Sequence, residues 1–220
     1  MSELPPFSPF SAGSIVSVNV SQVRTIDMRG KAVETGILKS PVAGRVRVEG
    51  VNLAGDDQAD RNVHGGPERA VYAYASEDYA WWAGELGDEV PHGKFGENLT
   101  LRGVDVDGAR IGERWRAGST ILQVTAPRVP CYKLATVMGD PAFVKRFAEA
   151  LHPGAYLAIV EPGDLAAGDA VEIVSRPEHD LTIASMTRIY FFERERIEEM
   201  LVPELPNEWR AWVAERRAKA

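Results

Sequence analysis

The feature that most constrains this fold is a succession of short runs in which β-branched or other apolar residues alternate with polar ones. The first run, SIVSVNVSQVR, occupies residues 14–24, and its period of two is typical of a strand with one buried face. Similar runs, nearly all bounded by glycine, proline or aspartate, occur at 45–53, 97–104, 119–125, 155–160 and 169–175. Many short strands separated by turn residues predict a mainly β protein, either a barrel or a sandwich.

Two segments interrupt the strands with apolar residues at helical spacing. Residues 67–86 begin with a proline, which suits a first helical position, and they predict one helix. Residues 140–151 repeat the pattern, with Asp140 as the expected N-cap before a second proline. We expect both helices to cover a β core.

The composition along the chain predicts three parts. Residues 1–13 contain several prolines and no continuous apolar run, so they predict a disordered tail. Residues 14–176 hold all the predicted strands. Beyond Pro177 helix formers dominate, and residues 177–220 predict a small helical domain of two or three short helices. Its last helix would carry three apolar residues on one face: Trp209, Trp212 and Val213.

Charge and cysteine usage exclude several classes of protein. The net charge of −7 disfavours general nucleic-acid binding, because a phosphate backbone rewards a basic surface. No apolar window approaches the roughly 18 residues of a membrane span. A single cysteine cannot form an internal disulfide, which is typical of a reducing compartment. We therefore expect a cytoplasmic protein with neither nucleic acid nor membrane as a partner.

Two polar, glycine-containing stretches are candidates for a binding site. In GDDQADRNVHGG, residues 55–66, His64 precedes Gly65 and Gly66, which would set an imidazole beside backbone N–H groups that favour an anion. In KFGENLT, residues 94–100, Asn98 has an amide that both donates and accepts hydrogen bonds. A solvated connection and a turn leading into a strand are the competing interpretations of the two stretches.

The stretch TAPRVPCYKL, residues 125–134, holds the chain's only cysteine. Pro127 and Pro130 fix their own φ angles and restrict their neighbours, so Cys131 would lie in a stiff, extended loop. Arg128 and Lys133 would favour the thiolate, which is the form that attacks or binds a soft metal. A thiol buried as a small hydrophobic group is the alternative. Phosphate-loop, dinucleotide and zinc signatures are absent from the sequence, whereas spacing alone does not exclude a Cys–His pair.

Taken in order, three stretches resemble the MOSC domain family, and specifically its YiiM-like branch: LAGDDQADRNVHGGPERAVYAY, FGENLTLRGV and IGERWRAGSTILQVTAPRVPCYKL. The resemblance runs from about Ile15 to Val174, and the segment after it is similar to the branch's small C-terminal three-helix domain. It implies a MOSC-type β-barrel with peripheral helices that binds a molybdenum cofactor, Mo-molybdopterin. The sequence departs from the pattern at Val63, where many relatives have a second histidine, and at Arg69, where lysine is common.

The resemblance also implies roles for individual residues. Cys131 matches the protein ligand of the metal. The cofactor pocket would be formed by Lys39, His64, Gly65, Asn98, Arg128, Cys131 and Lys133, with Asp60 in its wall. His64 or Asp60 would protonate the departing oxygen, and His64 is preferred because its ordinary pKa lies near neutrality.

The activity that the resemblance implies is the reduction of small N-hydroxylated bases such as 6-hydroxylaminopurine, a detoxifying reaction. The sequence has no flavin or nicotinamide motif, so electrons would come from a separate flavoprotein or iron–sulfur protein. A sulfur carrier with a persulfide on Cys131 and a non-catalytic cofactor-binding module are the alternatives. A pyridoxal phosphate-binding role is a further hypothesis for such a chain. Four aromatic residues would either pack the helical segment onto the barrel or form a homodimer interface: Tyr190, Phe191, Phe192 and Trp209.

Overall fold

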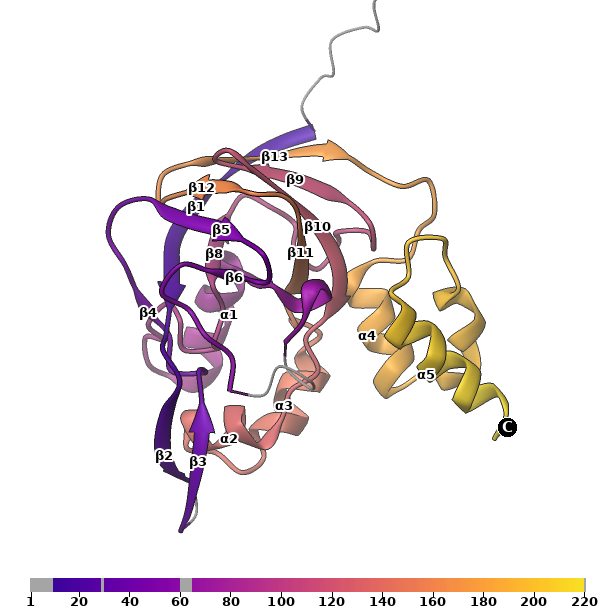
Figure 1. Cartoon of the computed structure of the whole chain (residues 1–220). Helices are drawn as coiled ribbons and strands as arrows, with labels where there is room; N and C mark the ends of the chain where they lie inside the picture. The colour runs from indigo at the N-terminus through magenta and orange to yellow at the C-terminus, as the bar shows by residue number, and fades with distance from the viewer. Residues whose placement is uncertain (1–9, 29, 60–64, 220) are drawn as a thin grey trace, which may run out of the picture.

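The computed structural model describes residues 10–28, 30–59 and 65–219. Within these residues, seven strands close into a barrel (Figure 1). In order around the barrel they are β1 (Phe10–Val20), β8 (Leu99–Arg102), β7 (Val71–Ala75), β11 (Ala155–Glu161), β10 (Thr120–Pro127), β9 (Arg114–Ala117) and β13 (Ala170–Ser175), which pairs with β1 again. Neighbouring strands are antiparallel except β7 and β8. The prediction of a mainly β barrel is confirmed.

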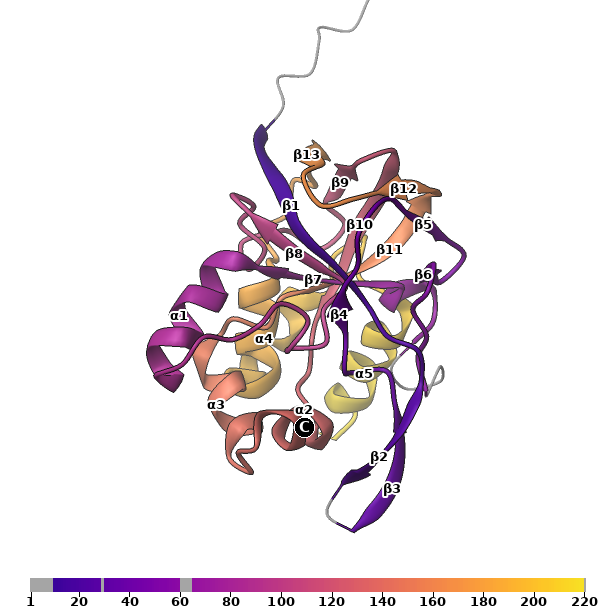
Figure 2. The same cartoon turned by 90° about the vertical axis from the view of Figure 1, so that its left-hand side faces the viewer.

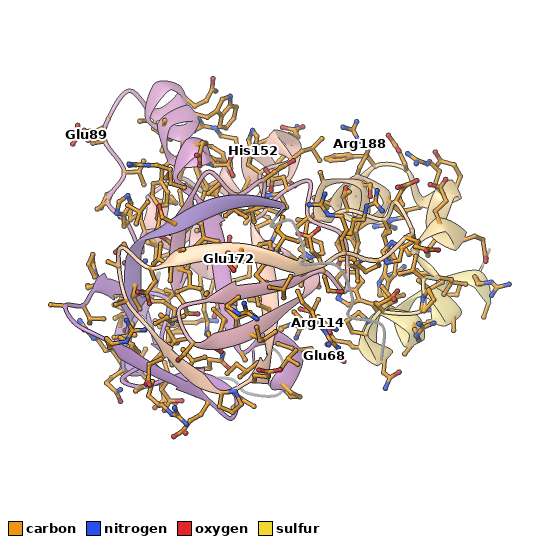
Figure 3. All side chains as sticks on the ribbon, turned by 90° about the horizontal axis from the view of Figure 1, so that it is seen from above. Glu68, Glu89, Arg114, His152, Glu172 and Arg188 are labelled. Carbon is orange, nitrogen blue, oxygen red and sulfur yellow. The ribbon has the colours of Figure 1, made fainter. Side chains whose placement is uncertain are left out.

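The barrel forms because alternate side chains along its strands point into one shared interior. On β9, for example, Trp115 is buried while its neighbour Arg114 is exposed. Figure 3 looks down on the molecule and labels Arg114 and Glu172, which come from the adjacent strands β9 and β13. Closure leaves these seven strands without an open edge, which satisfies their backbone groups and prevents pairing with another chain.

The barrel begins earlier in the chain than we predicted. Strand β1 starts at Phe10, and Gly13 pairs with Val171 on β13. The boundary at residue 14 was therefore wrong, because residues 10–13 belong to the barrel rather than to the predicted tail. Ala12 and Gly13 are small residues that show no alternation of apolar and polar side chains, so the sequence showed no strand pattern there.

The predicted helix at 67–86 was wrong over its first half. The structure has a 3-10 turn, η1 (Pro67–Arg69), then strand β7, and only then helix α1 (Ser76–Leu86). All five residues of β7 are buried, because Val71, Ala73 and Ala75 pack into the barrel core on one face while Tyr72 and Tyr74 pack into a second, aromatic core on the other. A strand buried on both faces shows no alternation, so its sequence resembles part of a buried helix.

Two of the helices lie below the barrel in Figures 1 and 2 and, together with a third, build the second, aromatic core. Helix α2 (Tyr132–Met138) was not predicted, and α3 (Phe143–Ala150) begins after the turn at Asp140. The Asp140 carboxylate accepts the N–H of Ala142 at 2.8 Å, which fixes this turn. Seven aromatic rings pack between these helices, α1 and the barrel: Tyr72, Tyr74, Tyr79, Trp82, Phe95, Phe143 and Phe147.

The remaining strands form smaller sheets beside the barrel. They are the hairpin β2 (Arg24–Met28) and β3 (Lys31–Thr35), strand β4 (Ser40–Pro41) on β1, and the sheet of β5 (Val46–Glu49), β6 (Asn52–Leu53) and β12 (Gly163–Leu165). The run 45–53, predicted as one strand, is thus a hairpin. Gly50 lies in its turn with φ of 63°, a conformation that glycine adopts without strain.

Beyond Pro177 the described chain forms α4 (Ile183–Phe191), the 3-10 segment η2 (Arg194–Met200) and α5 (Asn207–Arg217). Ile183, Ile189 and Val213 belong to the same hydrophobic core as the barrel residues, so these helices pack on the barrel directly. Trp209 is 7% exposed, whereas Phe192 is 52% exposed. Among the described residues, no helix combines the length and apolar character that a membrane crossing requires.

Candidate functional site

A cleft opens where strand β10 ends. Pro127 at the end of β10 pairs with Ala155 at the start of β11, and the chain then leads through residues 128–131 into α2. Five of the predicted site residues line this cleft: Lys39, Asn98, Arg128, Cys131 and Lys133. Gly65 does not line it within the described part of the chain. Asp60 and His64 lie outside the described residues, so their predicted roles stay predictions.

Cys131 lies at the N-cap of α2 in an extended conformation, with φ of −125° and ψ of 171°. Cys131, directly after Pro130, is therefore extended as expected, although a helix follows it at once. The thiol group belongs to a half-buried residue that lines the cleft and also a second cavity next to it. Cys131 is thus presented to two cavities rather than sealed among aliphatic side chains.

Arg128 places a buried positive charge at the cleft. The residue is 6% exposed, its guanidinium donates a hydrogen bond to the carbonyl of Phe95, and it lies 5.1 Å from the ring centre of Tyr72. Within the described chain, no carboxylate lies within ion-pair distance of it. A carbonyl dipole and an aromatic face compensate a buried cation only in part, so this wall of the cleft favours an anionic ligand.

A buried network holds Lys39 on another wall. Its ammonium forms an ion pair with Asp56, whose other carboxylate oxygen accepts the Asn98 amide at 2.9 Å. The Asn98 oxygen in turn accepts the backbone N–H of Tyr72 at 3.0 Å. Burial lowers the pKa of Lys39 below its ordinary value, although the Asp56 charge opposes this shift. Asn98 therefore lines the cleft as predicted, but its amide binds the protein itself.

Several residues of the cleft were missed by sequence reasoning. Asp57 and Gln58, which line the cleft, and Asp56, which pairs with Lys39, lie in the polar stretch 55–66 that the sequence singled out, yet nothing local assigned them to the site. The Gln58 amide nitrogen donates to the Arg69 carbonyl at 3.1 Å, while its buried oxygen has no hydrogen-bond partner within the described chain. A buried acceptor of this kind suits an N–H group of a bound heterocycle.

The donor set of the cleft fits a cofactor that combines a soft metal, a polar heterocycle and a phosphate. The Cys131 thiol supplies a soft ligand, and Gln58 supplies an acceptor for the heterocycle. Among the described residues, two cations of the cleft, Arg128 and Lys133, can compensate an anion. The other two cations that line it are already paired, Lys39 with Asp56 and Arg69 with Glu208.

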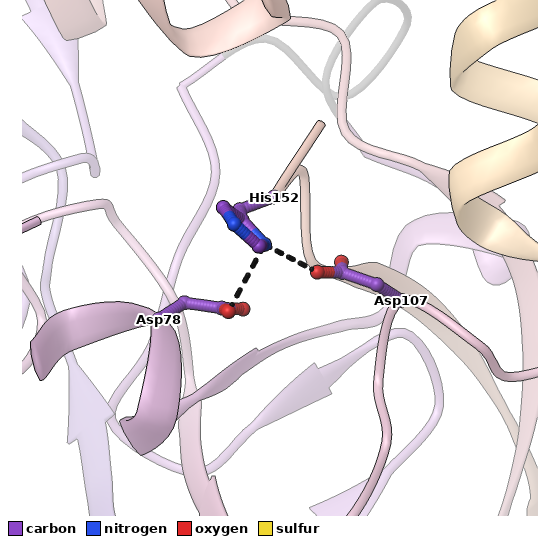
Figure 4. Close-up of side chains that lie close together, drawn as sticks. All are labelled: Asp78, Asp107 and His152. Carbon is purple, nitrogen blue, oxygen red and sulfur yellow. Dashed lines mark hydrogen bonds and ion pairs between the residues drawn. The ribbon is translucent and has the colours of Figure 1, made fainter. Parts of the chain in front are cut away.

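A second cluster of titratable groups lies away from this cleft (Figure 4). The Nδ1 atom of His152 is 2.8 Å from an oxygen of Asp107 and 3.1 Å from an oxygen of Asp78. Hydrogen bonds to Asp107 and Asp78 raise the pKa of His152 from 6.5 to about 10. In its protonated form the imidazole bridges the two carboxylates as an ion pair with each. The two ion pairs connect Asp78 on α1 with Asp107, in the loop after β8, through His152, in the loop before β11.

Comparison with known proteins gives this geometry a context. The MOSC domain family model matches residues 60–172. The chain is similar to uncharacterized protein YflK of Bacillus subtilis, with 34% identity over 90% of this chain and 91% of that protein. It is similar to protein YiiM of Escherichia coli, with 32% identity over 70% of each chain.

Two further similarities concern the fold and a longer relative. The crystal structure of YiiM from Geobacillus stearothermophilus matches with a TM-score of 0.77 and 31% identity, covering 93% of this chain and 98% of that one. A protein named Reductase from Gibberella moniliformis is 26% identical over 80% of this chain, a region that makes up 32% of that protein.

Proposed function

The chain belongs to the MOSC domain family as a YiiM-like member, and from this premise we propose that it is a molybdenum-cofactor-dependent reductase of N-hydroxylated nucleobases such as 6-hydroxylaminopurine. The observation that carries the proposal is the presence of the Cys131 thiol in one cleft with Arg128, Lys39 and Lys133. The relative named Reductase supports the reaction class. None of the relatives named above supports pyridoxal phosphate binding, and we do not propose it.

Particular residues would hold the cofactor. The Cys131 thiolate would ligate the metal, since a thiolate is a soft ligand. Arg128 and Lys133 would compensate the phosphate, and the Gln58 oxygen would accept an N–H of the pterin. When bound, the cofactor supplies the two-electron chemistry that removes oxygen from an N–OH group.

The overall reaction balances with an external reductant. The N–O bond of the hydroxylamino group breaks, and two electrons and two protons convert the group to an amine and water. The electrons would come from a separate flavoprotein or iron–sulfur protein, which is oxidised. The protons would pass through His64 or Asp60, as the sequence suggested.

Metal analysis tests the proposal directly. Protein made in cells that synthesise the cofactor should contain stoichiometric molybdenum, and Cys131→Ser should lose it. Tyr132→Phe is the matched control, because Tyr132 follows Cys131, is 55% exposed and does not line the cleft. This control should keep the metal.

Other outcomes would separate the alternatives. Absence of molybdenum together with a sulfane-sulfur signal on Cys131 would favour the sulfur carrier. Bound cofactor without reduction of 6-hydroxylaminopurine by any reduced donor would favour the binding module. In a deletion strain sensitive to 6-hydroxylaminopurine, equal rescue by wild type and Cys131→Ser would reject the metal-ligand role.

A further inference from the structure

A second cavity adjoins the cleft on the side of the C-terminal helices. Its volume is about 300 Å³, which lies at the lower end of the range of about 300–1,000 Å³ for small-molecule sites. The barrel side contributes Arg69, Cys131 and Tyr156, all of which also line the cleft. Cys131 therefore lies where the two cavities meet.

The far wall of this cavity is aromatic. It is built from Tyr190 on α4 and from Trp209 and Trp212 on α5. The ring centres of Tyr190 and Trp212 are 5.0 Å apart, and those of Tyr190 and Trp209 are 5.4 Å apart. The cavity opens to solvent, so a flat molecule could enter it and reach these rings.

The electrostatics of the two cavities differ. The cleft contains the cations Lys39, Arg128 and Lys133, none of which lines the second cavity. The second cavity contains Arg69 ion-paired with Glu208, with 2.6 Å between nitrogen and oxygen. A balanced pair beside aromatic rings does not select a phosphate. It offers a donor and an acceptor at the edge of a stacking surface, which matches the edge and face of a nucleobase.

We propose that this cavity is the substrate subsite, in which a planar N-hydroxylated base stacks on the aromatic wall of α4 and α5 with its N–OH group toward Cys131. The C-terminal helices then form part of the binding site in addition to covering the barrel. This inference rests on the proposed function, because it assigns the cleft to the cofactor and the adjoining cavity to the base.

Equilibrium dialysis of the full-length protein with 6-hydroxylaminopurine, and separately with adenine, tests the subsite without turnover. Trp212→Ala should weaken binding of both bases roughly tenfold or more, since base stacking on an aromatic side chain is lost. Trp212→Phe keeps a flat ring and should bind nearly as the wild type does. Phe192→Ala is the matched control, because Phe192 is an exposed aromatic residue of the same helical segment that does not line the cavity.

Two results would overturn the proposal. One is base binding by Trp212→Ala that equals that of the wild type. The other is an equal loss in Phe192→Ala, which would show that the assay reports on the helical segment in general. Circular dichroism and thermal unfolding establish that each variant is folded.

If Trp212→Ala does not fold, base binding by Glu208→Gln tests the subsite in its place. The Glu208 side chain is 61% exposed, so the substitution leaves the packing in place while removing the charged acceptor. Binding of 6-hydroxylaminopurine should fall several-fold, because a hydrogen bond to a charged group is lost. Unchanged binding in this variant would reject the subsite.

Failure of the subsite and failure of the proposed function give different results. Cys131→Ser should lose molybdenum yet still bind adenine, because the aromatic wall is intact. Base binding that depends on Trp212 in a protein without molybdenum would leave the subsite standing and reject the reductase. In the loaded enzyme, reduction that depends on Cys131 but shows an unchanged KM in Trp212→Ala would reject the subsite alone.

Discussion

Replacing Asp56 with asparagine tests whether a buried carboxylate holds Lys39 in the wall of the cleft. The Asp56 side chain is 1% exposed and that of Lys39 is 8% exposed. Asp56 also accepts the Ser21 N–H and the Asn98 amide, each at 2.9 Å. Asparagine keeps the shape of the side chain, removes its charge and turns an N–H group toward one of these donors. Lys39 would then stay buried without its ion partner.

The structure indicates a large cost for this change. Removing one partner of a buried ion pair costs about 3–5 kcal/mol, because the other charge is left uncompensated. Burial already lowers the pKa of Lys39, and loss of Asp56 would lower it further. Lys39 can therefore escape part of the penalty by losing its proton. We therefore expect Asp56→Asn to lower the free energy of unfolding at neutral pH by about 3 kcal/mol, the lower end of that range.

Urea unfolding followed by circular dichroism at pH 7 and pH 9 measures the effect. The penalty is fully present while Lys39 is charged in the folded variant, and it should shrink as the pH rises through the pKa of Lys39 in that variant. Asp180→Asn is the matched control: Asp180 pairs with Arg110 at 2.8 Å, but its side chain is 89% exposed. That change should cost less than about 1 kcal/mol. The reasoning would be refuted if Asp56→Asn lowered the free energy of unfolding as little as the control does, or by the same amount at both pH values.

Three further predictions concern other parts of the molecule. Because the pKa of His152 is raised to about 10, its stabilising effect is complete below about pH 6.5 and is lost as the pH rises through 10. His152→Gln should therefore lower the free energy of unfolding at pH 6 by on the order of 1–2 kcal/mol, a value reduced because the ring is partly exposed. Above pH 10 the variant should match the wild type in thermal unfolding. Phe147→Ala should cost about 3–5 kcal/mol in urea unfolding, since the ring is 1% exposed and packs on Trp82. Arg128→Lys keeps the charge but loses the planar group that lies over the Tyr72 ring, so molybdenum content should fall while secondary structure by circular dichroism is retained.

Much of the barrel was predictable because its signals are local. Strands β10, β11 and β13 fall close to the predicted runs. In β13 and the first half of β11 exposure alternates along the strand, whereas β10 is buried almost throughout and was predicted from its apolar and β-branched residues. The site signal was local as well. Two prolines, a cysteine and two cations within one stretch predicted a presented thiol, and the structure has Cys131 at the edge of the cleft.

Other features depended on pairings that no local pattern encodes. Strand β7 was misread as helix because the barrel core buries one of its faces and the aromatic core buries the other. Asn98 was predicted to face a ligand, but Asp56 and the Tyr72 N–H engage its amide. The sequence could not reveal that Glu208 on the last helix meets Arg69 beside the barrel.

The sequence by itself thus determined the periodicity of the strands, the stiff loop and the thiol it presents, because these follow from each residue's own backbone preference and polarity. Tertiary structure alone decided which charges neutralise one another and which stay available to a ligand. Lys39 meets Asp56, whereas Arg128 meets a carbonyl and aromatic rings. The physical reason is that the free energy of a buried charge depends on the groups within a few ångströms of it, and closure of the barrel brings those groups together from distant parts of the chain.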